Sequence, residues 1–269
     1  MAGTRTREAE HAASRLERTR AFRIAARAGY AVAGLLHVII GILAISVGVH
    51  ARGGQADQTG ALRSVAQAPG GILLLVLMIV ALLALGVWQI LRSITAEQRD
   101  EKQKWRSRFS AWGQAIGYLF LGGIAISVAL GGGSSSGGTT LTAQLLAAPG
   151  GVVLIVAVGL GVVGGGVWFA FKGVTKKFLD DLRPEGRLRG VVETLGVVGH
   201  VAKGFALAVL GVLIVVAAVT ADPDQAEGLD AAFQALARVP FGEVLVVLVG
   251  VGFVCYGVYS GFRARFARL

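Results

Sequence analysis

The chain repeats one spacing three times: a proline, an aromatic residue nineteen positions later, and a cation four positions after that. Nearly every side chain between the proline and the ring is apolar, and a Gly-Val pair precedes each ring. A helix that begins near proline and ends at an aromatic residue and a cation has the length of a membrane crossing, because 20 residues rise about 30 Å. The three copies are Pro69–Trp88–Arg92, Pro149–Trp168–Lys172 and Pro240–Tyr259–Arg263.

Six apolar stretches of this length occur in the chain, and its mean hydropathy of +0.68 exceeds that of soluble domains. A soluble helical core of this size would need amphipathic helices to cover it, and the sequence has almost none. We therefore predict an all-α fold: a six-transmembrane-helix bundle built from three parallel in–out–in helical hairpin repeats with pseudo-threefold symmetry. The stretches are approximately 29–50, 70–91, 112–131, 150–171, 195–220 and 241–262.

The repeats also divide the chain. The predicted segments are a basic N-terminal segment (1–27), hairpin repeat 1 (28–95), a linker (96–111), hairpin repeat 2 (112–178), a second linker (179–194), and hairpin repeat 3 with a short basic tail (195–269). The second helices align on their prolines without gaps. The first helices align less well, and in the middle repeat only Gly113 fits the glycine register clearly. Glycines permit close approach of membrane helices, so Gly161–Gly165 and Gly257–Gly261 predict packing faces.

Each outer loop ends in a short run with helical apolar periodicity just before its proline. We expect one or two helical turns there, lying on the outer membrane interface with these positions buried. The apolar positions are Leu62, Val65 and Ala66; Leu141 and Leu145; and Phe233 and Leu236.

The net charge of +10 is unevenly distributed between alternate loops, and this distribution indicates the membrane topology. The two termini and the second and fourth loops hold 22 basic residues, whereas the alternating loops hold only Arg52, Arg63 and Arg238. The positive-inside rule therefore places both termini in the cytoplasm of a bacterial inner (plasma) membrane protein. The same distribution favours contact with anionic lipids of the bilayer at the cytoplasmic face, or with a partner protein there, and argues against nucleic-acid binding.

The hairpin entries and the first helix resemble a known family. The entries are A-P-G-G after residues 67 and 147 and V-P-F-G after residue 238, and the opening G-Y-x-x-x-G runs from Gly29 to Gly34. These features resemble a bacterial, mainly actinobacterial, triple-hairpin integral membrane family catalogued as domain of unknown function 1206. The resemblance covers residues 25–266 and implies this topology but no activity. In that family the residue before the second opening glycine is commonly arginine; here it is Ala33 in the first copy and Lys203 in the third, and the middle copy lacks the motif.

Lys203 is the polar residue that most needs an explanation, because it lies about 12 Å into the fifth span. A lysine near the bilayer centre costs about 2.5–3.5 kcal/mol on insertion scales. His200 lies one turn before Lys203, and Tyr30 and His37 share a face of the first helix. We predict that these four residues converge, either as an anion or headgroup site or as a snorkelling lysine with structural partners.

The three aromatic–cation pairs predict interfacial anchors, because the rings favour the headgroup level and a cation one turn beyond lies among phosphates. These residues are Trp88, Arg92, Trp168, Lys172, Tyr259 and Arg263.

Motifs for catalysis or cofactor binding are missing from the sequence: no Walker loop, zinc spacing, haem attachment signature or nucleophile elbow occurs, and Cys255 is the single cysteine. We therefore expect no enzymatic activity, no cofactor and no metal. The leading hypothesis is non-enzymatic binding of a partner protein or an anionic lipid at the cytoplasmic face. The alternative is a small-solute or ion transporter or channel with its path along the pseudo-threefold axis.

Overall fold

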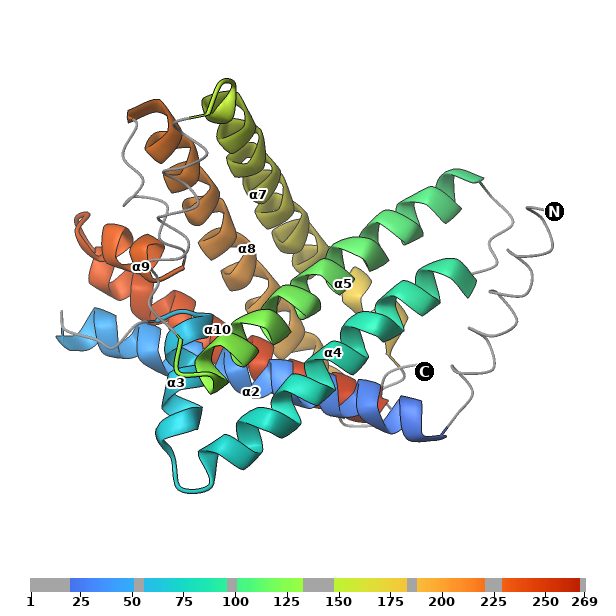
Figure 1. The fold of residues 1–269 in the computed structure, drawn as a ribbon. Helices are drawn as coiled ribbons and strands as arrows, with labels where there is room; N and C mark the ends of the chain where they lie inside the picture. Colours follow the sequence, from blue (N-terminus) through green and yellow to red (C-terminus); the bar gives the residue numbers. More distant parts are fainter. Residues whose placement is uncertain are drawn as a thin grey trace.

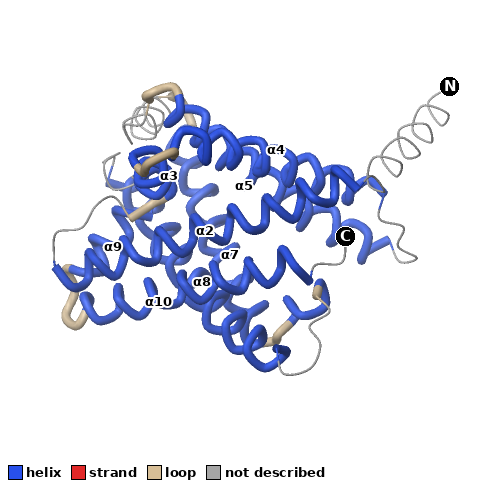
Figure 2. The backbone as a smooth tube through the Cα atoms, turned by 90° about the horizontal axis from the view of Figure 1, so that it is seen from below, coloured by secondary structure: helices blue, strands red, loops and turns tan. Residues whose placement is uncertain are grey.

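The computed structural model describes residues 20–50, 56–95, 101–132, 148–182, 188–220 and 229–266. This part of the chain contains helices and turns but no β-strand (Figure 2). Six helices are long and apolar enough to cross a membrane, which confirms the predicted six-span, all-α fold. They are α2 (Arg20–His50), α4 (Gly71–Thr95), α5 (Glu101–Ala129), α7 (Gly151–Val174), α8 (Leu188–Thr220) and α10 (Gly242–Phe266).

The prolines start the second helix of every hairpin through one local device, a type II turn. In each copy the amide two residues after the proline donates to the carbonyl just before it, at 2.8, 2.9 and 2.8 Å. The residue that follows the proline has positive φ in all three turns: Gly70 at 72°, Gly150 at 81° and Phe241 at 60°. Such turns favour proline followed by glycine, so the repeated P-G dipeptide fixes the entry of two spans and Phe241 adopts the same conformation without it.

The strongest packing joins neighbouring repeats. The second helix of each repeat packs along the first helix of the next: α4 with α5, α7 with α8, and α10 back onto α2 (Figure 1). Within hairpins, α2 also packs on α4 and α8 on α10. The middle hairpin differs, because α5 and α7 do not pack along each other. The bundle is therefore three helix pairs, of which the pair α4–α5 and the pair α7–α8 diverge (Figure 1).

Glycines facing glycines explain the two closest pairs. On the α2–α10 pair, a Cβ added at Gly34 would lie 2.7 Å from the carbonyl oxygen of Gly257. On the α7–α8 pair, a Cβ added at Gly204 would lie 2.5 Å from the carbonyl oxygen of Gly166. The contacts recur seven residues along each helix, Gly41 with Gly250 and Gly211 with Gly159, so the same side of each helix stays at the interface for two turns.

The α4–α5 pair corrects the glycine register of the middle repeat. Gly86 is equivalent to Gly166 and Gly257, and it lies against Ala115 and Leu119 of α5. Ala115 thus takes the place of Gly34, whereas Gly113 meets no atom within 4 Å. The sequence register based on Gly113 was wrong because a lone glycine in an apolar helix does not show which face it occupies.

The predicted glycine faces are also corrected in part. Gly257 packs against Gly34, but a Cβ at Gly161, Gly165 or Gly261 would meet nothing within 4 Å. Both pairs therefore have the predicted spacing of small residues, but only Gly257 packs against another helix. Gly261, Gly161 and Gly165 face away from the described helices.

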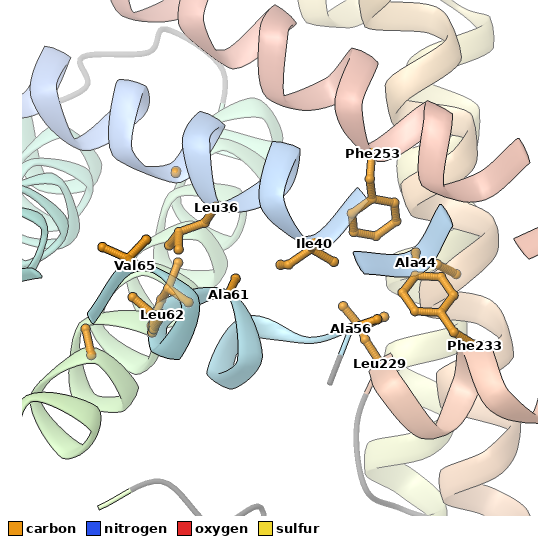
Figure 3. Close-up of a cluster of buried hydrophobic side chains, with 14 of the residues drawn as sticks. Leu36, Ile40, Ala44, Ala56, Ala61, Leu62, Val65, Leu229, Phe233 and Phe253 are labelled. Carbon is orange, nitrogen blue, oxygen red and sulfur yellow. The ribbon is translucent and has the colours of Figure 1, made fainter. Parts of the chain in front are cut away.

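Two short helices close one end of the bundle: α3 (Gln58–Gln67) and α9 (Leu229–Ala237). Both were expected from the sequence, and the third such segment (141–147) lies outside the described residues. Leu62 and Val65 of α3 are buried beside α2, and Phe233 of α9 packs edge-on to Phe253 of α10 at 5.8 Å (Figure 3). These helices extend the hydrophobic core at the end of the bundle opposite the basic segments.

Polar groups fasten α3 to α9. Asp57 caps α3 by accepting a hydrogen bond from the Gly60 amide at 2.7 Å, and Asp230 accepts one from the Ala56 amide at 2.9 Å. Burial, with the nearby Asp230 carboxylate, raises the pKa of Asp57 above its ordinary value.

Candidate intramembrane site

Lys203 lies where four membrane helices meet. Its ammonium Nζ is 2.9 Å from Nε2 of His37 on α2, 4.4 Å from the ring centroid of Tyr256 on α10, and 5.1 Å from that of Phe169 on α7. Lys203 and His37 are both partly exposed, whereas Tyr256 is buried. A cation over an aromatic face is favourable, by about 0.5–1 kcal/mol at an exposed site and about 2 kcal/mol when desolvated.

The hydrogen bonds of His37 fix the charge of the pair. Its Nδ1 lies 2.6 Å from the carbonyl oxygen of Ala33, and since a carbonyl only accepts, Nδ1 must hold a proton and donate it. The Lys203 ammonium has donors only, so Nε2 must be the acceptor of this contact and the His37 ring is neutral. His37 thus orients the lysine but provides no negative charge to balance it.

No carboxylate among the described residues lies in ion-pair range of Lys203. The ion pair recorded for this part of the chain joins Lys176 and Glu193, at the basic end of the bundle. The positive charge of Lys203 is therefore stabilised by π-faces and one neutral acceptor, without a counter-ion from the described protein.

His200 forms a separate aromatic cluster beside this site. Its Nδ1 donates to the carbonyl oxygen of Gly196 at 2.7 Å, and its ring stacks on Phe178 at 4.8 Å. Tyr256 and Tyr259 each present a ring to it at 5.1 Å. These contacts account for the burial of His200.

Three cations lie within electrostatic range of this aromatic cluster. The charges of Lys172, Lys203 and Arg263 all act on His200, and the same three act on Tyr256. They come from α7, α8 and α10, and we call them the cation cluster. Phe169, which contacts Lys203, precedes Lys172 by three residues, so the Lys203 ammonium lies about 5 Å further into the bundle than the level of Lys172.

Tyr30 lies apart from Lys203. It accepts a hydrogen bond from Gln89 Nε2 at 3.4 Å, and the Arg263 guanidinium stands over its ring at 4.5 Å. The same Gln89 nitrogen donates to Gln114 at 2.9 Å. Of the four predicted site residues, the structure brings His37 and Lys203 into contact, places His200 next to them, and separates Tyr30. Gln114 occupies on α5 the place that Lys203 has on α8.

The six residues predicted as interfacial anchors lie in different environments. Trp88, Tyr259 and Arg263 are buried and pack against protein, whereas Trp168 is exposed and Lys172 is half-buried. The side chain of Arg92 lies outside the described part of the structure. The ring of Trp168 therefore lies at the surface of the described structure, while helix packing encloses the rings of the other two pairs.

Two residues of the site, Tyr256 and Phe169, were not singled out from the sequence. Both lie within one turn of a predicted aromatic anchor, on helices whose apolar residues fill every face. An alignment of the repeats would have given a signal, because both positions change between repeats: the first repeat has Leu85 in the place of Tyr256 and Gln89 in the place of Phe169. In the described residues no group of three His, Cys, Asp or Glu side chains could hold a metal ion.

Comparison with known proteins agrees with the repeats. The model of a family described as Domain of Unknown Function (DUF1206) matches the chain three times, at residues 28–96, 109–176 and 198–267. The first match begins as far before Gly34 as the second match begins before Ala115. The family matches and the helix contacts therefore give the same alignment of the first two repeats. The uncharacterised protein YxxB of Bacillus subtilis (strain 168) is 28% identical over 240 residues, which is 87% of each chain. No solved structure matches.

Proposed function

Because this chain belongs to the DUF1206 family, a domain of unknown function, we propose a role from its own geometry: it binds the anionic headgroup of a membrane lipid without catalysing a reaction. The observation behind this proposal is the Lys203 ammonium, which lies in a membrane span beside a neutral His37 and has no described carboxylate in range. Such a charge is costly in hydrocarbon, and an anion drawn toward it would lower that cost.

The position of the cation cluster suits a lipid phosphate. Lys172 stands at the basic end of α7, at the headgroup level that the aromatic–cation pattern indicates, and Lys203 is about one turn deeper. A phosphate between these two ammonium groups could accept hydrogen bonds from both, and bonds to charged groups contribute about 1.5–3 kcal/mol each. An acidic segment of a partner protein offers similar charge but would have to enter the membrane to reach Lys203.

The orientation follows from the basic residues. We place the basic end of the bundle, and both termini, on the cytoplasmic side of a bacterial inner membrane, where anionic lipids are accessible. In this orientation the cation cluster opens toward the cytoplasmic leaflet.

The test compares Lys203→Met with Arg265→Met in nanodiscs containing phosphatidylglycerol and phosphatidylcholine. Arg265 is an exposed cation near the same end, so this variant removes the same charge outside the cluster. Native mass spectrometry should show about tenfold weaker retention of phosphatidylglycerol in Lys203→Met, corresponding to about 1.4 kcal/mol, and little change in Arg265→Met. Equal retention in both variants, with both folded, would exclude the headgroup role.

Transport along the pseudo-threefold axis is the second candidate. It is favoured by the contact between Lys203 and His37, which belong to different repeats and are both partly exposed. Proteoliposomes loaded with small anions would decide it: flux that depends on Lys203 supports transport, and a sealed bilayer with bound lipid supports the binding role.

A further inference from the structure

The middle repeat exposes a face of α7 that the other two repeats bury. Nine residues after its proline, Val158 is 52% exposed, whereas Met78 and Val249 at the same position are 0% and 6% exposed. Further along this face, Gly161 and Gly165 are exposed and have no atom within 4 Å of an added Cβ. Because equivalent positions of the other two repeats are buried, the exposure of this face is a property of the middle hairpin alone among the three repeats.

At the basic end of the same face, α7 is again more exposed than the equivalent helices of the other two repeats. Trp168 is 41% exposed, whereas its counterparts Trp88 and Tyr259 are 3% and 1% exposed. Val158, Gly161, Gly165 and Trp168 are spaced three and four residues apart, so they form one stripe along α7.

Contacts inside the other hairpins show what is missing. In repeat 1, Gly29 of α2 lies against Leu85 of α4, and in repeat 3, Gly252 of α10 lies against Ala202 of α8. The counterparts of this second pair are Gly161 and Gly113, and both are open. We call the uncovered surface the α5–α7 seam; it comprises the α7 stripe together with Gly113 and Gly117 of α5.

We propose that one acyl chain of an anionic lipid lies in the α5–α7 seam, with the lipid phosphate at the cation cluster. This inference rests on the proposed headgroup site and adds the route and the ligand class: a membrane lipid that enters sideways between two spans. The seam itself is a separate observation, because it follows from comparing repeats.

The order of charge and apolar surface along the seam complements that of an anionic lipid, with cations at one end for the headgroup and an apolar stripe for the acyl chain. Trp168 and Lys172 stand at its basic end, and the adjacent Phe169 connects α7 to the Lys203 ammonium at 5.1 Å. Away from that end, the stripe is apolar and its glycines leave a shallow surface.

The length of the seam also fits one leaflet. From Trp168 to Val158 the stripe covers ten residues, which rise about 15 Å, half of the roughly 30 Å hydrocarbon thickness. An acyl chain anchored at the headgroup level spans this distance. The depth agrees as well, because Gly113 is the counterpart of Ala202, the neighbour of Lys203.

Filling the seam tests the inference. Gly161→Leu places a side chain in the seam, and Gly123→Leu is the matched control, because Gly123 is also exposed with nothing within 4 Å but lies on another face of α5 than Gly113 and Gly117. In nanodiscs containing phosphatidylglycerol, native mass spectrometry should show about tenfold less retained phosphatidylglycerol for Gly161→Leu than for Gly123→Leu. Thermal unfolding of both variants checks that they remain folded.

The two proposals can fail separately. Full retention of phosphatidylglycerol in Gly161→Leu, with loss in Lys203→Met, would overturn the seam and keep the headgroup site. Loss in Gly161→Leu without loss in Lys203→Met would reject the cation cluster as the anchor, and with it the anionic lipid. Equal loss of phosphatidylcholine and phosphatidylglycerol in Gly161→Leu would show a seam that takes lipid without regard to charge, which also overturns the inference as stated.

A cross-link distinguishes a lipid from protein in the seam. Gly113→Cys and Gly161→Cys, combined in a Cys255→Ser background, should cross-link slowly in membranes with phosphatidylglycerol and at least tenfold faster after delipidation in detergent, when α5 can approach α7. Rapid cross-linking within one chain in those membranes would mean that the hairpin is closed. Cross-linking between two chains would mean that a second copy covers the seam, and either result overturns the inference.

Discussion

Replacing Gly204 by alanine should loosen the α7–α8 pair. The added Cβ would lie 2.5 Å from the Gly166 carbonyl oxygen and 2.6 Å from the Ala170 amide nitrogen, and both are backbone atoms that move only with their helix. Restoring ordinary contact requires the helices to separate by about 1 Å, which forfeits a quarter to a half of the dispersion attraction across the gap. Overpacking of this kind costs about 1–3 kcal/mol, more than the roughly 1 kcal/mol that alanine gains over glycine within a helix.

Gly164→Ala is the matched control on the same helix pair. A Cβ at Gly164 meets nothing within 4 Å, so only the gain in helix propensity remains. We expect Gly204→Ala to unfold at lower denaturant than the parent and Gly164→Ala at equal or higher denaturant, a separation of about 2 kcal/mol. Unfolding in mixed dodecylmaltoside and sodium dodecyl sulfate micelles, followed by tryptophan fluorescence, measures it. Indistinguishable curves for the two variants would refute the argument that glycine contacts hold the pair together.

Three further predictions concern the turns, the outer cap and the orientation. Gly150→Ala should lose about 1–2 kcal/mol although its Cβ meets no atom, because φ is 81°; unchanged unfolding would contradict the turn argument. The raised pKa of Asp57 means that the folded chain binds this proton more tightly, so its contribution to stability falls as pH rises from 3.8 through the folded pKa. The stability of wild type relative to Asp57→Asn should therefore be greater at pH 4 than at pH 7, and a pH-independent difference in chemical unfolding would disprove it. Reporter fusions at Leu269 should behave as cytoplasmic and those at Ser135 as exterior; the reverse pattern would overturn the orientation.

Much of the fold could be predicted from local patterns. The three prolines indicated where the second spans begin, because a proline and the residue after it determine a turn without help from distant parts of the chain. The runs before Pro69 and Pro240 indicated α3 and α9, since apolar periodicity alone specifies a short helix with one buried side. The intramembrane site was only partly predictable. Lys203 and His37 were expected to converge, and they do, but the separation of Tyr30 and the contact with Tyr256 depend on how the helices rotate.

The sequence by itself determined six spans, three repeats and the concentration of basic residues in alternate loops, because span length, turn chemistry and charge distribution are properties of short segments. Only the tertiary structure decided that each second helix pairs with the next repeat and that α10 returns to α2. In helices that are apolar on every side, hydrophobicity does not select a partner; close contacts such as Gly34 with Gly257 do, and they join residues more than two hundred positions apart. The open seam between α5 and α7 has the same origin: Gly161 resembles its packed counterpart Gly252 in sequence, and the difference lies in whether a neighbouring helix covers it.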